Sequence, residues 1–503
     1  MSSARTGGTT AGADGADPRR WWGLVVIALA QLMVVLDATI VNIALPSAQR
    51  ALGMSDGNRQ WVITAYTLAF GGLLLLGGRI ADLAGRKRTF VIGLTGFAAA
   101  SAFGGAAQTP GMLFGARALQ GAFAAVLAPS ALSLLTTTFT DPRERGKAFG
   151  IYGALAGSGS AIGFIVGGLL TEYLNWRWCL YVNVPIAVLA VAGAVVLLHD
   201  RPGRTGGRLD VPGALLGCGG LVAIVYGFSE AQPRGWSDPL VLGLFAAGAV
   251  LLAGFVGWQT RAPSPLLPLH IVKDRDRGGS FLTMALATVA MFGLFLFLTY
   301  YLQVILGYSP VRAGLGFLPL TVAIIIGSTQ ISARLLHRLA PRLLMVPGTL
   351  LAACGLLLLT RITVHSSYPT EILPALLLMG LGMGLTFMPV FATATSGVAP
   401  QDAGVTSATV NTSQQVGGSI GTALLNTVAT TSSAGYLAAH LHDPARKAAV
   451  VPEAVVHGYT VAIWWASGVM LLAGLVAGLL VTAKPPEHDS PAEMPMPECQ
   501  SPM

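Results

Sequence analysis

The sequence consists of long apolar stretches that alternate with short polar gaps, and this alternation restricts the fold more than any other feature. A helix needs about 20 apolar residues to cross the hydrocarbon core of a bilayer. Inside lipid every backbone polar group must be paired, which favours helices. The sequence therefore predicts an all-α membrane protein with fourteen transmembrane helices. The predicted spans are residues 22–45, 60–78, 89–107, 111–138, 148–170, 179–198, 211–229, 239–258, 279–302, 313–332, 342–360, 371–392, 404–428 and 459–482.

The charges in the gaps indicate how the chain crosses the membrane. Only 10% of the 503 residues are charged, whereas soluble proteins carry about 25%. Most of the 30 Lys and Arg residues lie in alternate gaps, in the set that includes both ends of the chain. Cytoplasmic loops carry the excess of basic residues. We therefore predict that both termini are cytoplasmic, with a disordered tail at 1–21 and a second tail at 483–503.

Two segments of the chain resemble each other. The loop GGRIADLAGRKR (77–88) follows the second span, and SARLLHRLAPR (332–342) follows the tenth. The Gly-rich fifth span also has a counterpart in the thirteenth. Two related halves around a central path are typical of transporters, with sites near the midplane between the repeats. The predicted segments are two six-helix halves, 22–198 and 279–482, and between them an inserted helix pair with its loops, 199–278.

Several of these segments resemble motifs of the major facilitator superfamily. GGRIADLAGRKR is similar to its signature loop, RALQGAFAAVLAPSALSLL (117–135) to its fourth-helix motif, and GSGSAIGFIVGGLL (157–170) to the fifth-helix motif of its exporters. The resemblance implies a proton-coupled antiporter in a bacterial cell membrane that exports a hydrophobic or amphipathic small molecule, such as an antibiotic. Segments similar to the fourteen-helix drug:proton antiporter branch are LDATIVNIALP (36–46), WRWCLYVNVPI (176–186), LDVPGALL (209–216), YLQVILGYSPVRAGLGFLP (301–319) and DAGVTSATVNTSQQVGGSIGTALL (402–425).

Two other functions are alternatives at this point. An importer on the same fold would take up a nutrient or a siderophore, but the exporter-type glycine motif argues against it. A membrane sensor or scaffold would transport nothing, but the sequence shows no attached soluble signalling domain. The sequence has no phosphate-binding GxxxxGK[ST] loop and no HExxH metal motif. We expect no enzyme activity, no cofactor, no metal and no nucleic-acid partner, and we expect a monomer in the bilayer that uses protons.

Asp37 is an acidic residue well inside a predicted span, where a carboxylate costs about 2.5–3.5 kcal/mol. If the first helix ends near Leu45 and the fourth begins near Pro110, Asp37 and Arg117 lie at similar depths, roughly 10–12 Å below the outer face. A nearby cation favours the ionised acid, and burial favours the protonated acid. We predict that Asp37 binds the driving proton and that Arg117 controls it. A static pair that only joins two helices is the alternative.

The loop at 77–88 concentrates charged residues on the predicted cytoplasmic side. Its run of basic residues is explained by the positive-inside bias alone, but Asp82 adds nothing to that bias. An acid between basic residues can form charge-assisted hydrogen bonds. The resemblance implies a conformational latch in which Asp82 pairs with Arg86 and with Arg145. The predicted latch residues are Gly78, Asp82, Gly85, Arg86 and Arg145.

The fifth span carries three glycines spaced four residues apart and a fourth glycine directly after them: Gly159, Gly163, Gly167 and Gly168. Small residues at this spacing let two helices approach closely in lipid. Plain packing is one interpretation. The resemblance implies that this face seals against helix 8 or its counterpart in the other half.

Phe164 stands where the motif usually has proline, and Phe123 where the fourth-helix motif often has glycine. Each aromatic residue either packs or shapes the substrate pocket.

Uncharged polar side chains also occur inside the predicted spans. Together with aromatic residues they suit a bulky, amphipathic solute, whereas hydrogen bonds between helices, worth about 0.6 kcal/mol each, are the alternative. Because acids inside the spans are few, we expect neutral or singly cationic substrates. The candidate cavity residues are Gln31, Asn42, Gln120, Phe123, Phe164, Gln303, Asn411 and Gln415.

Overall fold

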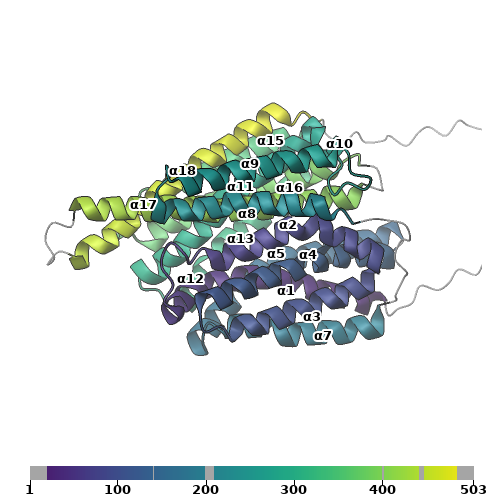
Figure 1. Cartoon of the computed structure of the whole chain (residues 1–503), viewed down its shortest axis with the longest axis horizontal. Helices are drawn as coiled ribbons and strands as arrows, with labels where there is room; N and C mark the ends of the chain where they lie inside the picture. The colour runs from purple at the N-terminus through teal and green to yellow at the C-terminus, as the bar shows by residue number, and fades with distance from the viewer. Residues whose placement is uncertain (1–19, 140, 199–208, 399–401, 441–446, 484–503) are drawn as a thin grey trace, which may run out of the picture.

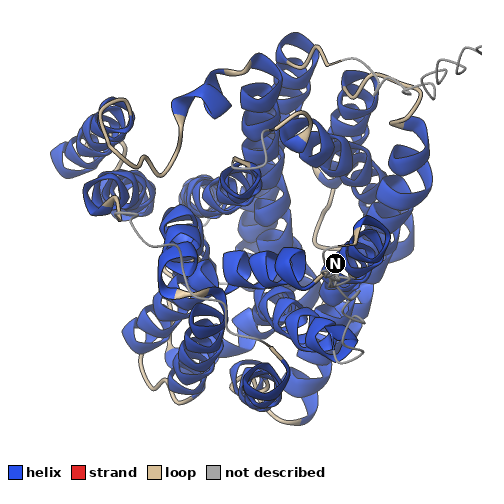
Figure 2. Cartoon of the chain, turned by 90° about the vertical axis from the view of Figure 1, so that its right-hand side faces the viewer, coloured by secondary structure: helices blue, strands red, loops and turns tan. Residues whose placement is uncertain are grey.

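The computed structural model describes residues 20–139, 141–198, 209–398, 402–440 and 447–483. Within these ranges the chain forms helices and connecting loops and contains no strand (Figure 2). The long helices run side by side in one bundle (Figure 1). This arrangement satisfies the requirement that a chain in lipid pairs its backbone groups within each segment.

The helices fall into three consecutive sets along the chain. The first set is α1 (Arg20–Leu52), α2 (Trp61–Ala84), α3 (Arg86–Gly105), α4 (Pro110–Thr138), α5 (Pro142–Tyr173), α6 (Trp178–Tyr181) and α7 (Asn183–Leu197). The second is α8 (Val211–Arg234), α9 (Pro239–Gln259) and the short α10 (Leu269–Lys273). The third is α11 (Arg275–Tyr300), η1 (Tyr301–Ile305), α12 (Pro310–Gly316), α13 (Leu318–Ile325), η2 (Ile326–Ser332), α14 (Ala333–Leu335), α15 (Arg342–Leu359), η3 (Tyr368–Ile372), α16 (Leu373–Thr395), α17 (Ala403–His440) and α18 (Lys447–Leu480), in which η marks π-helical segments.

Helical segments cover all fourteen predicted spans. In the described part of the chain, eleven helices are long and apolar enough to cross a membrane, and α3, α5 and α17 are not among them. These three helices are richer in Gly, Ser, Thr and Ala, which lowers their mean hydropathy. The all-helical fold is therefore as predicted, and eleven helices meet a length and composition criterion for spanning.

The prediction that the first helix ends near Leu45 is wrong, because α1 continues to Leu52 with Pro46 inside it. Pro46 and Ser47 suggest a break in the sequence, but membrane helices tolerate proline where neighbouring groups satisfy the freed carbonyl. The Pro46 carbonyl also accepts a hydrogen bond from the Arg50 Nε at 3.4 Å, one turn further along the helix. Asp37 consequently lies about two turns further from the end of its helix than the sequence suggested.

The first and third sets each pack mainly within themselves. In the first set α2 and α3 both pack on α4, and α1 packs on α5 and α7. In the third set α15 packs on α16, and α17 and α18 pack on each other and on α11. Two seams join the sets, one between α2 and α17 and one between α5 and α12. At the first seam a Cβ on Gly71 would collide with the Gln415 side chain, so the two helices are in close contact.

The α8–α9 hairpin packs against α2 and α17, and thus covers one of the two seams (Figure 1). Asp210 closes the hairpin at its open end. Its Oδ1 accepts hydrogen bonds from the Gly213 N–H at 2.9 Å and from Trp258 Nε1 at 2.7 Å, and its Oδ2 accepts from Gln259 Nε2 at 2.8 Å. The start of α8 is therefore tied to the end of α9 by one buried carboxylate.

We predict that Asp210→Ala lowers the stability of the protein by about 2 kcal/mol, because three donors lose a charged acceptor. Thermal unfolding in detergent measures the change. Asp238→Ala is the matched control: Asp238 also caps a helix of this hairpin, through the Leu240 N–H at 2.8 Å, but this contact is exposed. Equal melting temperatures for the two variants would contradict a special role for Asp210.

Candidate functional site

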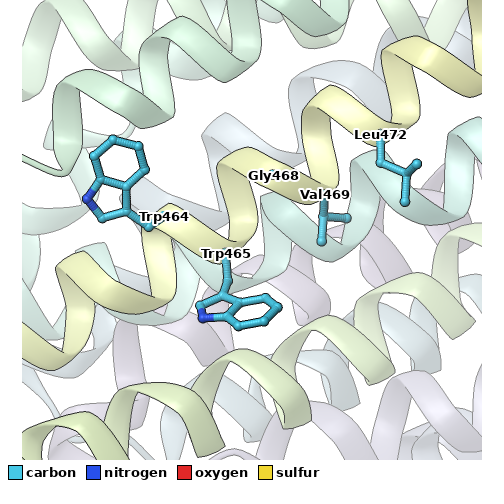
Figure 3. Close-up of a pocket in the computed structure, with 5 residues that line it drawn as sticks. All are labelled: Trp464, Trp465, Gly468, Val469 and Leu472. Carbon is cyan, nitrogen blue, oxygen red and sulfur yellow. The ribbon is translucent and has the colours of Figure 1, made fainter.

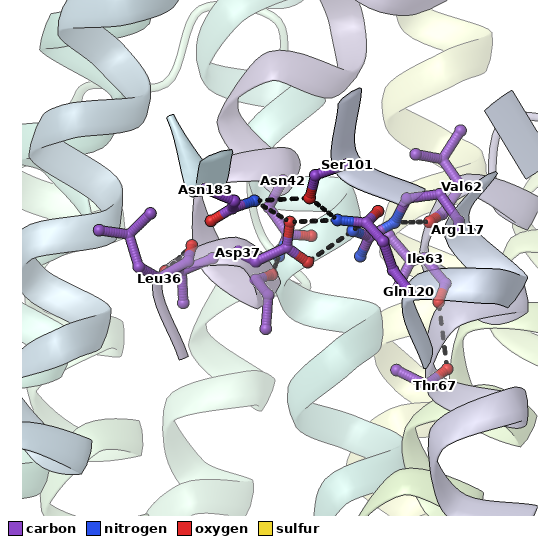
Figure 4. A network of polar contacts seen from close by, with 12 residues as sticks. Leu36, Asp37, Asn42, Val62, Ile63, Thr67, Ser101, Arg117, Gln120 and Asn183 are labelled. Carbon is purple, nitrogen blue, oxygen red and sulfur yellow. Dashed lines mark hydrogen bonds and ion pairs between the residues drawn. The ribbon is translucent and has the colours of Figure 1, made fainter. Parts of the chain in front are cut away.

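Asp37 on α1 and Arg117 on α4 form a buried ion pair. The side chain of Asp37 is 0% exposed and that of Arg117 is 2% exposed. Arg117 Nη1 donates to Asp37 Oδ2 at 2.6 Å (Figure 4). The structure thus brings Asp37 and Arg117 into contact, as predicted.

Further donors surround the Asp37 carboxylate. Its Oδ1 accepts from Gln120 Nε2 at 3.0 Å and from Asn183 Nδ2 at 2.8 Å. The same two amides also donate to the Ser101 hydroxyl (Figure 4). Sequence reasoning missed Ser101 and Asn183. Asn183 lies in the quoted segment WRWCLYVNVPI as a polar residue among apolar ones, and that was the signal that could have found it.

Arg117 is held on its other side by α2. Its Nε donates to the Val62 carbonyl at 3.0 Å, and its guanidinium lies 4.4 Å from the centre of the Tyr66 ring. Its Nη1 also donates to Gln120 Oε1 at 2.9 Å. These contacts all come from α1–α7, so the network lies inside the first set of helices and not between the two sets.

This network couples the charge on Asp37 to the positions of the groups around it. An ionised carboxylate accepts hydrogen bonds only, whereas a protonated one also donates. Neutralising Asp37 would leave the Arg117 cation buried without an anion, which is costly. The site can therefore exchange a proton only if its side chains or helices rearrange. In the described part of the chain, no cluster of His, Cys, Asp and Glu could hold a metal ion.

The predicted latch residues lie at the junction of α2 and α3. Asp82 Oδ1 is 3.7 Å from Arg86 Nη2, and both side chains are partly exposed. Gly85 separates the two helices with a φ of 97°, a conformation that favours glycine, and Gly78 lies beside Pro129 of α4. The side chain of Arg145 lies outside the described residues. The structure therefore brings Asp82 and Arg86 together within one set of helices.

The glycine stripe of α5 faces α1, so the expectation that it seals against the other half is wrong for these three residues. A Cβ would approach Val35 if placed on Gly159, Thr39 on Gly163 and Ile40 on Gly167. The spacing indicates a close approach but does not identify the partner helix.

Gly168, one residue further along α5, does meet the other set of helices. A Cβ there would lie within 3 Å of the backbone of Pro310 and Val311 on α12. A neighbouring face of α5 therefore carries the contact between halves that the resemblance implied.

The two aromatic residues at motif positions are packing residues in this structure. Phe164 is fully buried and stacks on Phe317, with ring centres 4.8 Å apart, and it also contacts Phe295. Phe123 covers Gly96 of α3. Phe164 thus belongs to the seam between α5 and the third set, and Phe123 to the interior of the first set.

The remaining candidate cavity residues do not gather at one place. Gln31 Oε1 accepts from the Tyr152 hydroxyl of α5 at 2.6 Å. Gln303, in the π-helical η1, reaches the Ile43 carbonyl of α1 at 2.9 Å. Asn411 and Asn42 donate to carbonyls four residues before them in their own helices. Within the described residues, Asn42 Oδ1 and Gln415 Oε1 are buried without a hydrogen-bond partner.

Two cavities in the described part of the chain have mainly apolar linings. One is an open groove on α18 lined by Trp464, Trp465, Gly468, Val469 and Leu472 (Figure 3). Its two tryptophans are more than half exposed, as is typical of residues that face lipid near a membrane interface. The other is a small, largely apolar space beside Arg117, between α1, α2, α4 and α6.

Comparison with known proteins gives a consistent result. A family model described as Major Facilitator Superfamily matches residues 27–422. The puromycin resistance protein pur8 of Streptomyces alboniger is 58% identical, with 94% of each chain covered. The cephamycin export protein CmcT of Amycolatopsis lactamdurans is 40% identical, with 84% of this chain and 88% of the relative covered. A bacterial homologue of the human lysosomal transporter Spinster, solved inward-facing and occupied, has the same fold, with a TM-score of 0.66, 16% identity and coverage of 93% and 97%.

We predict that Gly163→Val prevents normal packing of α5 on α1 and markedly lowers the yield of folded protein, because the new side chain would overlap Thr39. Fluorescence-detected size exclusion in detergent measures the yield. The control is Gly115→Val on α4, where a Cβ would meet nothing within 4 Å. A normal yield for Gly163→Val would mean that α1 and α5 separate without cost.

Proposed function

Because this chain belongs to the Major Facilitator Superfamily, we propose that it is a proton-coupled antiporter that exports a hydrophobic or amphipathic small molecule, in the first instance an antibiotic. As a member of this family it is a transporter, and it is a multi-pass protein of the bacterial plasma membrane. The observation that carries the proton-coupling proposal is the buried pair of Asp37 and Arg117. Ionisable residues within membrane spans usually mark ion or proton pathways.

We propose a topology of fourteen spans with both termini in the cytoplasm. Helices over all fourteen predicted ranges support it, as does the excess of basic residues in alternate gaps. In this topology the starts of α1 and α11 and the end of α18 are cytoplasmic. The two halves are α1–α7 and α11–α18, with α8 and α9 inserted between them.

In the proposed cycle Asp37 carries the proton and Arg117 sets when it is released. While Arg117 contacts the carboxylate, the ionised form is favoured; when the two separate, burial favours the protonated form. Gln120 and Asn183 keep Asp37 in place through both steps, because a protonated carboxyl retains an oxygen that accepts their hydrogen bonds. The substrate takes a different route, between the two halves, so proton and substrate exchange through helix movement and not by competing for one site.

The membrane potential supplies enough free energy per proton to keep the antibiotic concentration inside the cell low. One charge moving down roughly 150 mV yields about 3.5 kcal/mol. Each tenfold ratio of substrate concentrations across the membrane costs about 1.4 kcal/mol, so one proton supports a ratio of a few hundredfold. The relative of 58% identity is named for puromycin resistance. Puromycin is therefore the first substrate to test, followed by a panel of neutral and singly cationic antibiotics.

We predict that Asp37→Asn abolishes uphill transport of puromycin on a proton gradient. The variant should be less stable than the wild type, because Arg117 loses its anion, but should still fold in the membrane, because asparagine keeps one acceptor oxygen and Arg117 keeps its contacts with Val62, Gln120 and Tyr66. Uptake into inverted vesicles, with and without the gradient, measures this. Arg117→Lys should also weaken coupling, since lysine cannot contact Asp37, Gln120 and Val62 as guanidinium does.

The control for the coupling experiment is Asp238→Asn, an exposed carboxylate of the α9 cap. Substrate exchange without a gradient shows that the Asp37 variant still binds and moves puromycin. If Asp37→Asn still accumulates substrate against its gradient, another residue carries the proton. The antiport proposal fails as a whole if the wild-type protein moves puromycin without proton exchange. It also fails if the protein moves puromycin only in the direction that corresponds to import into the cell.

A separate prediction concerns Asp82 and Arg86. Asp82→Asn should leave insertion and folding intact, since both side chains lie partly exposed at the helix junction. It should reduce efflux several-fold by changing the balance between conformational states. Efflux from intact cells at matched expression is the measurement. Wild-type efflux in this variant would limit the loop to its role in membrane topology.

A further inference from the structure

Arg59 is a second arginine that is buried in the described part of the chain. It lies in the connection between α1 and α2 and is only 4% exposed. Its Nη1 pairs with Asp56 Oδ1 at 3.0 Å, and its Nη2 donates to the Tyr459 hydroxyl at 3.4 Å. Its guanidinium also lies 3.8 Å from the centre of the Tyr300 ring. The proton-coupling network uses none of these four residues.

The contacts of Arg59 join the two halves. Asp56 and Arg59 precede α2 in the first half, whereas Tyr300 ends α11 and Tyr459 belongs to α18 in the second half. Tyr459 is itself fixed by stacking on Phe297, with ring centres 5.2 Å apart. A cation supplied by one half therefore contacts a tyrosine ring and a tyrosine hydroxyl of the other.

Other contacts between the halves lie toward the same end of the bundle. The Asn426 amide of α17 donates to the Asp56 carbonyl at 3.0 Å. The Val311 N–H of α12 donates to Glu172 Oε2 at the end of α5 at 2.9 Å. At the opposite end, the ion pairs Arg20–Glu144 and His270–Asp402 each join neighbouring segments and do not cross between α1–α7 and α11–α18. The proposed topology places the Arg59 end outside.

We propose that Arg59 locks the outer end of the transport path and that this lock opens when substrate is released. The proposal rests on the proposed transport function and topology. Removing a guanidinium from water is costly, and the Tyr300 ring and the Tyr459 hydroxyl offset that cost only while the halves are together. When the halves separate, water solvates Arg59 instead. The contact therefore stabilises the outward-closed state relative to the open state.

Accessibility of a cysteine between the halves tests this directly. Ser419 of α17 is fully buried, and its hydroxyl donates to Thr67 of α2 at 2.8 Å. Ser419→Cys, in a background with the four native cysteines replaced by serine or alanine, reports opening from outside. The readout is its labelling rate in intact cells with a membrane-impermeant maleimide. We expect Arg59→Ala to raise this rate about tenfold, which corresponds to about 1.4 kcal/mol.

The matched control is Arg50→Ala. Arg50 is an exposed arginine at the same end of α1, and its guanidinium contacts Pro46 and Ser47 of its own helix. It should leave the labelling rate unchanged. Tyr459→Phe removes only the hydroxyl and should give a smaller increase than Arg59→Ala. Tyr300→Leu removes one ring and tests the lock independently if Arg59→Ala does not reach the membrane.

A rate in Arg59→Ala and Tyr300→Leu that equals or falls below the Arg50→Ala rate would overturn the proposal. Combining Arg59→Ala with Tyr300→Leu should add little to the larger single effect, because both remove the same contact. Additive effects would also contradict a lock built on this pair. Labelling requires neither a proton gradient nor a substrate, so the result stands apart from the outcome of the Asp37→Asn experiment.

Discussion

A carboxylate can remain charged inside an apolar bundle only where donors surround it, and the first half of this protein is arranged to supply them. The ion pair with Arg117 requires α1 beside α4, and the amides of Gln120 and Asn183 add contacts from α4 and α7. The close contact of α4 with α2 depends on Gly121, where a Cβ would meet the Tyr66 carbonyl. The packing of the first half and the charge on Asp37 are therefore interdependent.

The enclosure of Asp37 within one half has a mechanical consequence. In the proposed cycle a proton on Asp37 does not contact a substrate between the halves, so the two act on each other through α1. This helix carries Asp37, packs along the glycine stripe of α5 and also contacts α11 and α12 of the other half. A shift of α1 that separates Asp37 from Arg117 would therefore also change the contacts of α1 with α11 and α12.

Much of this arrangement could be predicted from the sequence, for identifiable reasons. Span length predicted the helices. The contact between Asp37 and Arg117 was also predicted, although the depth argument placed the end of the first helix seven residues too early. Periodicity predicted that α5 makes a close contact but not that α1 is its partner, because spacing reports the shape of a face and not its neighbour. In the sequence Arg59 is a single basic residue in a short gap between two spans. Its burial depends on Tyr300 and Tyr459, hundreds of residues away, and no local pattern contains that information.

The α8–α9 hairpin makes the two sides of the transporter unequal. Because it lies across α2 and α17, it covers one seam between the halves with two further helices, and Asp210 keeps those helices joined. The other seam, at α5 and α12, has no such cover from the hairpin. A molecule dissolved in the lipid therefore meets the hairpin on one side of the protein. On the other side it meets the uncovered seam between α5 and α12, where Phe164 and Phe317 are stacked.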